Sequence, residues 1–281
     1  MFTHLHVHSA FSFLDGGSQV TDLIKRAAEL GMTSLAITDH NNVSGAVKFV
    51  KTARNAGIKP IIGCEVTMEG GHHLTLLCKN STGYRELCNI LTNAHLTNKR
   101  GEPKVDLDTL ASHKEGLFIL SGCRKGLIPS LILQKRFKEA ADIAESYKNI
   151  FGKDAFFIEI SESLLPGSIS LNRTLSELAK FLGLYSVVTN NVHYAEKEDF
   201  QIHDILTCIR TLTTSEEVHP ERRLNAENYL KSEECMRMEH KDYPEALNMT
   251  CAIAGQCDCP IDLGVANFPA FDYPNGFNSA N

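Results

Sequence analysis

Thr3-His4-Leu5-His6-Val7-His8-Ser9 opens the chain and is the stretch that decides its fold. Histidines alternate here with apolar residues, which is typical of a β-strand, and alternate side chains of a strand point the same way. We therefore expect the three imidazoles to share one face of the first strand. The alternative is a polar, solvent-facing strand edge that happens to contain histidine. Because paired imidazoles at this spacing suit zinc, iron or manganese, we favour a metal site that includes His6 and His8.

The composition is that of an ordinary globular protein with enough apolar material for a full core. The chain has 281 residues, of which 43% are hydrophobic and 22% charged. This length allows one large barrel-type domain or two small ones. The formal net charge of -6 is unlike that of a dedicated duplex-DNA binder. Any contact with nucleic acid is therefore expected to be local, transient, or helped by metal ions or by other parts of an assembly.

Nine cysteines are scattered along the chain, and no CxxC pair occurs. Their odd number, their positions inside apolar runs and the lack of a recognisable signal peptide predict a reducing, cytoplasmic location. No apolar run approaches the ~18 residues that a membrane span needs, so we expect no membrane partner.

Seven apolar segments with strand character alternate with amphipathic helical patterns. The predicted strands are His4–His8, Ser34–Thr38, Lys59–Gly63, His73–Cys78, Leu117–Ser121, Ala155–Ile160 and Tyr185–Thr189. The predicted helices are Val20–Leu30, Val43–Ala56, Tyr84–His95, Phe137–Ile150 and Ser170–Leu182. This rhythm predicts an α/β fold with parallel strands covered by helices, in either an open sheet or a barrel.

The rhythm breaks in the last quarter of the chain. Two more helices are expected there, over Ser232–Glu239 and Pro244–Gln256. We predict a metal-binding barrel over residues 1–209 and a helical extension that packs on it over residues 210–265. Residues 266–281 are rich in Pro, Gly, Phe and Asn, which is typical of a linker, here toward a region absent from this chain.

Polar residues follow several predicted strands at the point where each strand ends. These residues are Asp39, His40, Glu65, Cys123, Asn191 and His193. In a (β/α) barrel the carboxyl ends of the strands form the active face, so these side chains are expected to meet His6 and His8 there. The set is too large for one tetrahedral ion and predicts two or three divalent ions. Such ions activate water, clamp a phosphoester and let an anionic phosphate approach an acidic protein.

Several polar residues near this face allow two interpretations. Asp15 lies in the turn sequence Leu-Asp-Gly-Gly, but its place just after the histidine strand favours a ligand. Asp39 either orients His40 or caps the following helix. Of the adjacent His72 and His73, a strand directs only one to the rim, and we favour His73. The remaining histidines are expected at the surface, and they are His95, His113, His203, His219 and His240.

The turn Ser-Gly-Cys123-Arg124-Lys125-Gly follows another predicted strand. Cys123 is either a small buried thiol or a metal ligand whose pKa the two neighbouring cations lower. Arg124 and Lys125 are either solvated loop charges or phosphate-binding residues. The ligand role and the phosphate-binding role are the alternatives that a structure can test.

A series of motifs resembles, in order along the chain, the PHP (polymerase and histidinol phosphatase) domain. The motifs are His6-Leu-His8-Ser, Ile-Thr-Asp-His40-Asn, Gly-Ile-Lys-Pro-Ile-Ile-Gly-Cys-Glu65, His73-Leu-Thr-Leu-Leu, Leu-Ser-Gly-Cys123 and Thr-Asn-Asn191-Val-His193-Tyr. More closely, they resemble the version at the N-terminus of bacterial DNA polymerase III alpha subunits. The short connection from Glu65 to His73 and the Leu-Thr-Cys-Ile-Arg stretch are most similar to the error-prone branch.

The resemblance implies a distorted (β/α)7 barrel, similar to a TIM barrel, with two or three zinc, manganese or iron ions. Carried over by position, the implied ligands are His6, His8, Asp15, His40, Glu65, His73, Cys123, Asn191 and His193. The implied catalytic residues, acting with the metal, are His6, His8, Asp15 and His193. The family is associated with phosphoesterase action and, in some polymerases, with 3′–5′ exonuclease proofreading.

One position departs from the family pattern. The family usually has Asp in an Asn-Asp-x-His motif, whereas this chain has Asn191 two residues before His193. An amide oxygen still coordinates a cation, but it carries no charge and cannot act as a base. We therefore expect one metal position to be lost or loosely held and the activity to be reduced.

Three functions are compatible with these observations. The first is a metal-dependent phosphodiesterase of exonuclease or pyrophosphatase type that acts on a DNA 3′ end within a DNA polymerase. The second is a metal-stabilised module that braces the polymerase or docks a proofreading subunit without turnover. The third is a free-standing phosphatase for a small phosphate ester, as in the histidinol phosphatase relatives. The extension beyond residue 210 favours the polymerase setting, although a fold does not by itself determine a function.

Overall fold

The computed structural model describes residues 1–264, and the linker predicted over residues 266–281 lies outside them. A six-stranded sheet forms its centre, and strands adjacent in sequence are adjacent in space. The strands are β1 (Ser34–Ile37), β2 (Lys59–Thr67), β3 (His73–Cys78), β4 (Leu117–Leu120), β5 (Phe156–Ser161) and β6 (Tyr185–Thr189). All six coincide with predicted strands, and the largest difference is at β2, which continues beyond Gly63 to Thr67.

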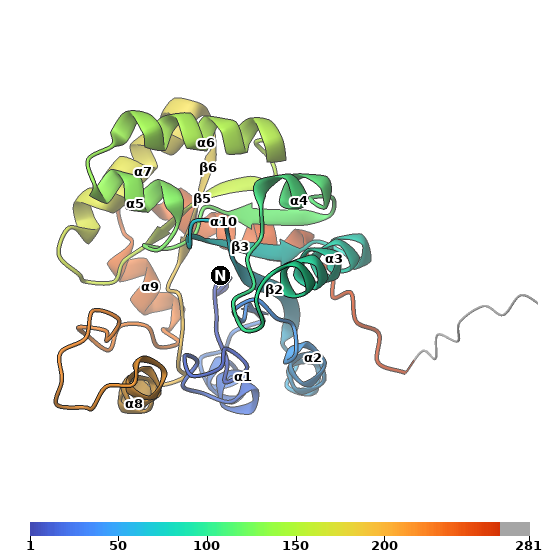
Figure 1. The fold of residues 1–281 in the computed structure, drawn as a ribbon. Coiled ribbons are helices and arrows are strands. Elements are labelled where there is room, and N and C mark those ends of the chain that lie inside the picture. The colour runs from blue at the N-terminus through green and yellow to red at the C-terminus, as the bar shows by residue number, and fades with distance from the viewer. Residues whose placement is uncertain (265–281) are drawn as a thin grey trace, which may run out of the picture.

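The N-terminal segment closes this sheet into a barrel. It bonds to β1 on one side, and on the other the amide of His8 donates to the carbonyl of Val192, just beyond β6. The amide of Val192 in turn donates to the carbonyl of His6. Six strands and this irregular segment therefore form a distorted seven-membered barrel surrounded by helices (Figure 1), and the predicted fold is confirmed.

The N-terminal segment is not the regular strand that its alternation predicts. The amides of Ala36 and Thr38 donate to the carbonyls of His4 and Val7, so the segment advances three residues where β1 advances two. The extra residue is a bulge, which breaks the alternation of side chains between the two faces. His4 consequently leaves the face that the next two histidines share, and its Nε2 lies 2.9 Å from the carbonyl oxygen of Lys231. The expectation that all three imidazoles share a face is wrong for His4.

Strand β3 runs against both of its neighbours, so the expectation of parallel strands is wrong at this point. Gly63 of β2 lies opposite Leu77, and Thr67 lies opposite His73, in an antiparallel register that continues between β3 and β4. The connection between β2 and β3 spans residues 68–72, which is too short for the crossover helix that parallel neighbours require. This reversal brings His73, the first residue of β3, to the rim where the parallel strands end.

Helices surround the barrel, with α5, α6 and α7 gathered on one side of it (Figure 1). The described helices are α1 (Val20–Glu29), α2 (Ala46–Asn55), α3 (Ser81–Thr97), α4 (Leu107–Ser112), α5 (Leu127–Leu133), α6 (Phe137–Phe151), α7 (Ser168–Leu182), the 3-10 helix η1 (Lys197–Asp199), α8 (Phe200–Thr211), α9 (Glu233–Glu239) and α10 (Pro244–Gln256). Within the described range, no helix combines the length and the apolar composition that a bilayer crossing requires.

Helices α4, α5 and α8 were not predicted, for two physical reasons. Helices α4 and α5 have six and seven residues, which is too short for a helical period to stand out. Helix α8 turns apolar residues outward, since Ile205 is 55% exposed while the polar His203 and Thr207 are buried. This pattern is the reverse of an ordinary surface helix.

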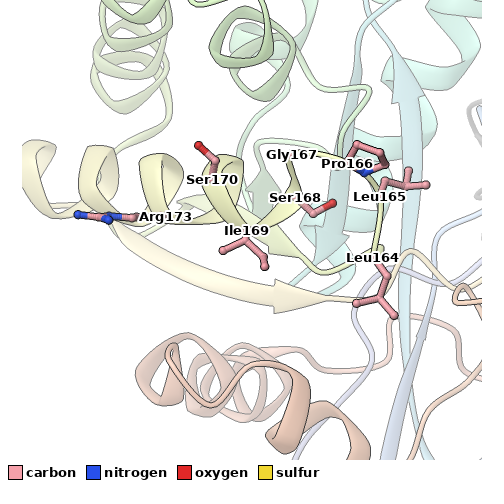
Figure 2. A pocket seen from close by; sticks show the side chains of 8 residues that line it. All are labelled: Leu164, Leu165, Pro166, Gly167, Ser168, Ile169, Ser170 and Arg173. Atoms are coloured by element: carbon pink, nitrogen blue, oxygen red, sulfur yellow. The ribbon is translucent and has the colours of Figure 1, made fainter.

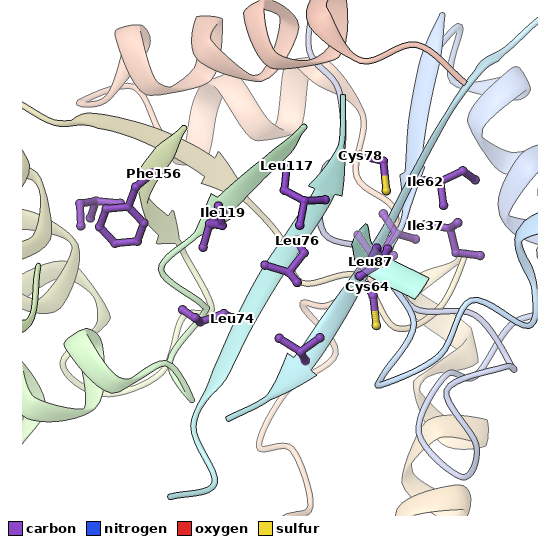
Figure 3. Packing of buried hydrophobic residues seen from close by; sticks show 14 of the residues in the cluster. Ile37, Ile62, Cys64, Leu74, Leu76, Cys78, Leu87, Leu117, Ile119 and Phe156 are labelled. Atoms are coloured by element: carbon purple, nitrogen blue, oxygen red, sulfur yellow. The ribbon is translucent and has the colours of Figure 1, made fainter. Parts of the chain in front are cut away.

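Alternating residues of the strands divide the buried core into two parts. On the outer face, Leu76 and Ile119 pack beneath the helices together with Leu87 of α3 (Figure 3). On the inner face, Leu77 and Phe118 belong to a second cluster inside the barrel. Because each strand buries both faces, its apolar residues form a nearly continuous run in the sequence.

Helices α9 and α10 pack at the end of the barrel opposite to the rim. Ile253 and Ala254 of α10 join the inner cluster with Leu5, and Met236 of α9 packs with Phe2. Helix α8 runs across the predicted boundary between residues 209 and 210. The division into a barrel and an extension therefore stays a prediction.

Candidate metal centre

Glu65 is the centre of a group of imidazoles inside the barrel rim. It lies on β2 and is 1% exposed. Its Oε1 is 3.4 Å from His6 Nε2 and 3.3 Å from His73 Nδ1. Its Oε2 is 3.0 Å from His40 Nδ1 and 3.5 Å from His8 Nε2. Side chains from the N-terminal segment, the end of β1, β2 and the start of β3 therefore meet at one carboxylate.

Asp15 connects two histidines beside this group. Its Oδ2 is 3.1 Å from His40 Nε2 and 3.0 Å from His193 Nε2. Its Oδ1 is 3.3 Å from Nη2 of Arg210, which lies on α8. Asp15 does lie in a turn, in which Leu14 has a φ of 57°, and its carboxylate still reaches the site.

Three overlapping sets of side chains place their ligand atoms close enough for an ion. In each set these atoms lie within 4.8 Å of one another. The sets are His6, His8 and Glu65; His40, Glu65 and His73; and His8, His40 and His193. Glu65 Oε1 and His73 Nδ1 are buried and have no hydrogen-bond partner in the described part of the chain. Imidazole nitrogen and carboxylate oxygen suit zinc, manganese and iron, so this donor set fits divalent ions.

Carboxylates raise the proton affinity of two of these histidines. Burial opposes protonation of His6, but Glu159 and Glu65 outweigh it and raise the pKa of His6 to about 10. Burial also opposes protonation of His40, but Glu65 and Asp15 outweigh it and raise its pKa to about 9. The site therefore draws positive charge into a buried place, which is the electrostatic requirement for a cation site.

His8 and His193 are held in the neutral form. Burial is the main cause that lowers both pKa values, to about 3 for His193 and well below the usual range for His8. The neighbouring His40 adds to the effect at His8, and Arg223 adds to it at His193. Neutral imidazole is the form that coordinates a metal ion.

Glu159 supports His6 from the side away from Glu65, and it was not among the predicted site residues. It lies on β5, and its Oε1 is 2.7 Å from His6 Nδ1. The same oxygen accepts a hydrogen bond of 2.5 Å from the Thr189 hydroxyl. A carboxylate on the far nitrogen of an imidazole fixes the orientation of the ring and raises its basicity. The available signal was a lone Glu inside the apolar strand Phe156–Ser161.

Asp39 neither orients His40 directly nor caps a helix, so both interpretations are wrong. Its carboxylate accepts hydrogen bonds of 2.7 and 2.8 Å from the amide and hydroxyl of Ser9. It also accepts one of 2.6 Å from the hydroxyl of Ser12. Ser12 Oγ in turn lies 3.1 Å from His8 Nδ1. Asp39 thus holds the loop after the histidine segment and acts on His8 through Ser12.

Cys123 and Asn191 meet at the edge of the site. Asn191 Nδ2 donates to Cys123 Sγ at 3.2 Å. The expectation of an acidic thiol is wrong, because Cys123 is buried, and burial together with Glu65 and Glu159 raises its pKa to about 12. Neither residue is a member of the three sets found among the described residues, and their role as ligands stays a prediction.

A cavity of about 710 Å³ lies beside these residues. Asp15, Cys123 and Asn191 line it, and so do Arg124 and Lys125, the two predicted phosphate-binding residues. Three arginines that the sequence analysis did not single out also line it, and they are Arg210, Arg222 and Arg223. Arg210 was missed because it lies on α8, which was not predicted, and Arg222 and Arg223 were missed because their stretch of sequence is polar and aperiodic.

Two histidines expected at the surface are buried instead. His203 and His240 are each 1% exposed. His203 Nδ1 lies 2.7 Å from the backbone oxygen of Asp15, so this residue supports the site turn. A helical context does not reveal burial where, as in α8, the polar side of the helix faces inward. The other three lie fully or partly at the surface, as expected, and they are His95, His113 and His219.

Comparison with solved structures finds similar folds at low identity. An amidohydrolase from Chromobacterium violaceum matches with a TM-score of 0.46 and 19% identity, over 69% of this chain and 88% of that chain. A lesion-specific endonuclease from Pyrococcus furiosus matches with a TM-score of 0.39 and 14% identity, over 68% of this chain and 48% of that chain. These likenesses are too distant to support an argument about function.

Comparison with curated proteins finds closer relatives. An error-prone DNA polymerase of Symbiobacterium thermophilum is 47% identical over 99% of this chain and 27% of its own length. The DNA polymerase III alpha subunit of Treponema pallidum is 40% identical over 99% of this chain and 25% of its own length. That of Escherichia coli K12 is 36% identical over 96% of this chain and 24% of its own length. The chain thus spans about a quarter of the length of these relatives.

A sequence profile of one family covers the part of the chain that builds most of the site. The PHP domain profile matches residues 4–163 of the 281, a range that includes the histidine segment, Asp15, Glu65 and His73. His193 lies beyond the matched range but reaches the same site through Asp15. From this match, the chain belongs to the PHP domain family.

Proposed function

We propose that this chain is the metal-dependent phosphoesterase domain of a DNA polymerase of the DNA polymerase III alpha type. We propose further that it hydrolyses the phosphodiester at a DNA 3′ end. The observation that carries this proposal is the convergence of Glu65, Asp15 and five histidines at the barrel rim, beside a cavity lined by cationic side chains. The relatives at 36–47% identity support the polymerase setting.

Two or three divalent ions of zinc, manganese or iron are the proposed cofactors. We assign one ion to His6, His8 and Glu65, and a second to His40, Glu65 and His73. His8, His40 and His193 form the third set. Asp15 lies within reach of the third set, with Cys123 and Asn191 at its edge. When bound, such ions supply an activated water and neutralise charge on the phosphoester.

Further roles are proposed for Asp15 and Asn191. Asp15 is ionised, since His193 and His40 outweigh the effect of burial and hold its pKa well below the usual range. Asp15 Oδ2, 3.0 Å from His193 Nε2, is the proposed atom that accepts a proton during hydrolysis. Asn191 supplies an uncharged oxygen at its position, so we expect a weaker site than a carboxylate would give.

Arg124 and Lys125 are the proposed phosphate-binding residues on the β4 side of the cavity. Both line it, next to Cys123. Arg124 Nη1 is buried and has no hydrogen-bond partner in the described range, which leaves a donor for an incoming oxygen. A guanidinium group with free N–H donors is well suited to the oxygens of a phosphate.

The test of this function is degradation of a 3′-labelled single-stranded DNA oligonucleotide by the purified chain, with manganese or zinc supplied. The matched control is the double variant His6→Ala/His8→Ala, purified in the same way. We expect shortening from the 3′ end that needs the metal and is absent in the control. Bound metal is measured in both proteins, so that a lack of activity is read together with the metal content.

Other outcomes would contradict the proposed activity. No shortening by protein that carries its metal would favour the structural module that braces the polymerase or docks a proofreading subunit. Turnover of a small phosphate monoester without any action on DNA would favour a free-standing phosphatase.

A further inference from the structure

The cavity beside the metal centre has cationic residues on two walls that come from distant parts of the sequence. Arg124 follows β4, whereas Arg210, Arg222 and Arg223 lie on or after α8. Its volume of about 710 Å³ is in the range of sites that enclose a small organic ligand. The cavity is therefore large enough for more than a phosphate group alone.

The cations of this cavity differ in how far their charge is already neutralised. Arg210 pairs with Asp15 and Glu221, and Arg222 pairs with Asp204. These two arginines hold the fold together and leave little charge for a ligand.

Arg124 and Arg223 have no carboxylate within 4.0 Å in the described part of the chain. Nη2 of Arg124 donates to the backbone oxygen of Pro166 at 3.1 Å. Arg223 is positioned by neutral acceptors, with Nε 3.0 Å from His203 Nε2 and Nη1 2.8 Å from Asn228 Oδ1. Both guanidinium groups thus keep their full charge at the cavity, which is a strong attraction for an anion.

Part of the cavity lining is apolar. Leu165 and Pro166 line it, in the loop before α7 that Figure 2 shows, and Leu133 and Leu224 line it as well. This combination of two arginines without carboxylate partners and several apolar lining residues matches a ligand with an anionic end and a flat, partly apolar end.

We propose that this cavity binds a nucleoside 5′-monophosphate, with its phosphate held by Arg124 and Arg223 and its base against Leu165 and Pro166. The inference extends the proposed function, because a 5′-mononucleotide is what hydrolysis from a DNA 3′ end releases. Arg223 also lies against the metal centre, with Nη2 2.9 Å from His193 Nε2, so the phosphate site adjoins the reacting end of a bound strand. The nucleotide binds without any covalent step.

Isothermal titration calorimetry of the full chain with 2′-deoxyadenosine 5′-monophosphate tests the proposal, with inorganic phosphate and 2′-deoxyadenosine as partial ligands. Arg223→Gln and Arg124→Gln are each expected to weaken binding of the nucleotide and of phosphate at least about tenfold, the loss expected for a charge-assisted contact. Leu165→Asn is expected to weaken binding of the nucleotide but not of phosphate. Arg85→Gln, on the exposed surface of α3, is the matched control and should leave both affinities unchanged.

Bound metal is measured in every variant, because Arg223 touches His193. The proposal is overturned if both arginine variants bind the nucleotide as the wild type does, or if deoxyadenosine binds as tightly as its phosphate. It is also overturned if the loss of binding in Arg223→Gln merely follows a loss of metal while Arg124→Gln has no effect. Arg124→Gln removes a side chain with a single hydrogen bond, so it keeps the test valid if Arg223→Gln does not fold.

The oligonucleotide assay on the same proteins separates this inference from the proposed function. Nucleotide binding that depends on both arginines, without any shortening of DNA, would support the cavity inference and contradict the hydrolytic function. If the wild type shortens DNA, and both arginine variants bind the nucleotide as tightly as the wild type does, the result would support the hydrolytic function and contradict the cavity inference.

Discussion

At the scale of single residues, the site depends on Glu65, a carboxylate whose ionised form is disfavoured by its burial. Burying an ionised carboxylate costs several kcal/mol unless opposite charges and hydrogen bonds compensate for it. Glu65 has four imidazoles within 3.5 Å, and His40 is the first of those that outweigh burial and hold its pKa well below the usual range. Because four histidines contact this one carboxylate, substitution of Glu65 is a direct test of the site.

Glu65→Gln is expected to lose at least one bound ion per chain, because Glu65 belongs to two of the three ligand sets. Elemental analysis after dialysis against metal-free buffer measures this loss. Glu159→Gln is a second variant for comparison, since it leaves every proposed ligand in place and alters only the partner of His6 Nδ1. This variant is expected to bind metal about 10- to 100-fold more weakly. An unchanged metal content in Glu65→Gln would show that the ions bind elsewhere.

Asn191→Asp is expected to tighten binding of the weakest ion about tenfold or more, because it adds a charge beside the cation sites. The φ of Asn191 is 44°, in the left-handed region that Asp tolerates almost as well as Asn. Its Oδ1 is buried and without a hydrogen-bond partner within the described residues, so the new charge has room to coordinate. Metal titration followed by calorimetry measures the change.

The control for that variant is Asn190→Asp at the neighbouring position. The Asn190 amide donates to the backbone oxygens of Glu227 and Tyr229, and a carboxylate cannot do so. We therefore expect Asn190→Asp to lower the melting temperature without any gain in metal affinity. A tighter site in Asn190→Asp, or none in Asn191→Asp, would refute the assignment of Asn191 to the metal centre.

At the scale of elements, β2 carries the change from parallel to antiparallel pairing. It pairs in parallel with β1 up to Ile62, and from Gly63 onward it pairs with β3 in the opposite direction. A Cβ atom on Gly63 would lie 2.3 Å from the backbone oxygen of Leu76 in β3. The close approach of the two strands, which positions Glu65 against His73, therefore requires glycine here.

Gly63→Ala is expected to destabilise the protein by about 1–3 kcal/mol or more, because the clash is with backbone that cannot move without moving β3. The matched control is Gly255→Ala in α10, where an added Cβ meets nothing within 4 Å. The control is expected to gain about 0.5–1 kcal/mol from helix propensity. Urea denaturation of both variants measures the difference, and equal stabilities would refute the requirement for glycine at β2.

At the scale of the whole molecule, buried polar groups join the N-terminal segment to the residues just before α9. His4 Nε2 lies 2.9 Å from the Lys231 backbone oxygen. The Lys231 side chain is fully buried, with Nζ 2.9 Å from Glu227 Oε2 and 2.8 Å from Glu239 Oε2. Burial is the main cause that lowers the pKa of His4, to about 4.

The low pKa of His4 makes the stability of the fold depend on pH. Above pH 6.5, the imidazole is neutral in both the folded and the unfolded chain. As the pH falls from 6.5 toward 4, the His4 imidazole binds a proton in the unfolded chain but not in the folded chain, so the free energy of unfolding decreases. We expect a contribution of about 2 kcal/mol between pH 7.5 and pH 5.

His4→Gln is expected to lose this contribution, so its stability should fall less steeply than that of the wild type over the same interval. Urea denaturation of both chelator-treated proteins at the two pH values measures the difference in slope. Equal slopes would show that His4 is protonated in the folded state or that this end of the barrel is open to water.

Much of this site was within reach of the sequence. The placement of His40, Glu65 and His193 at the ends of predicted strands rests on a rule of barrel geometry, and the three come together. Glu159 and Arg223 were missed, because a lone Glu in an apolar strand is a weak signal and Arg223 has no local pattern that marks it. Each acts on a histidine far away in the chain, through contacts of 2.7 Å to His6 and 2.9 Å to His193.

The sequence by itself determined the six sheet strands, most of the longer helices and many of the side chains that meet at the rim. Apolar periodicity, glycine stops and the donor types of histidine and carboxylate are local properties, so the six sheet strands and the set of potential metal ligands at the rim followed from them. The tertiary structure decided the direction of β3, the bulge that removes His4 from the site, and the burial of Cys123, which reverses the expected direction of its pKa. These features depend on loop length, on backbone register and on exclusion of water, which arise only when distant parts of the chain pack together.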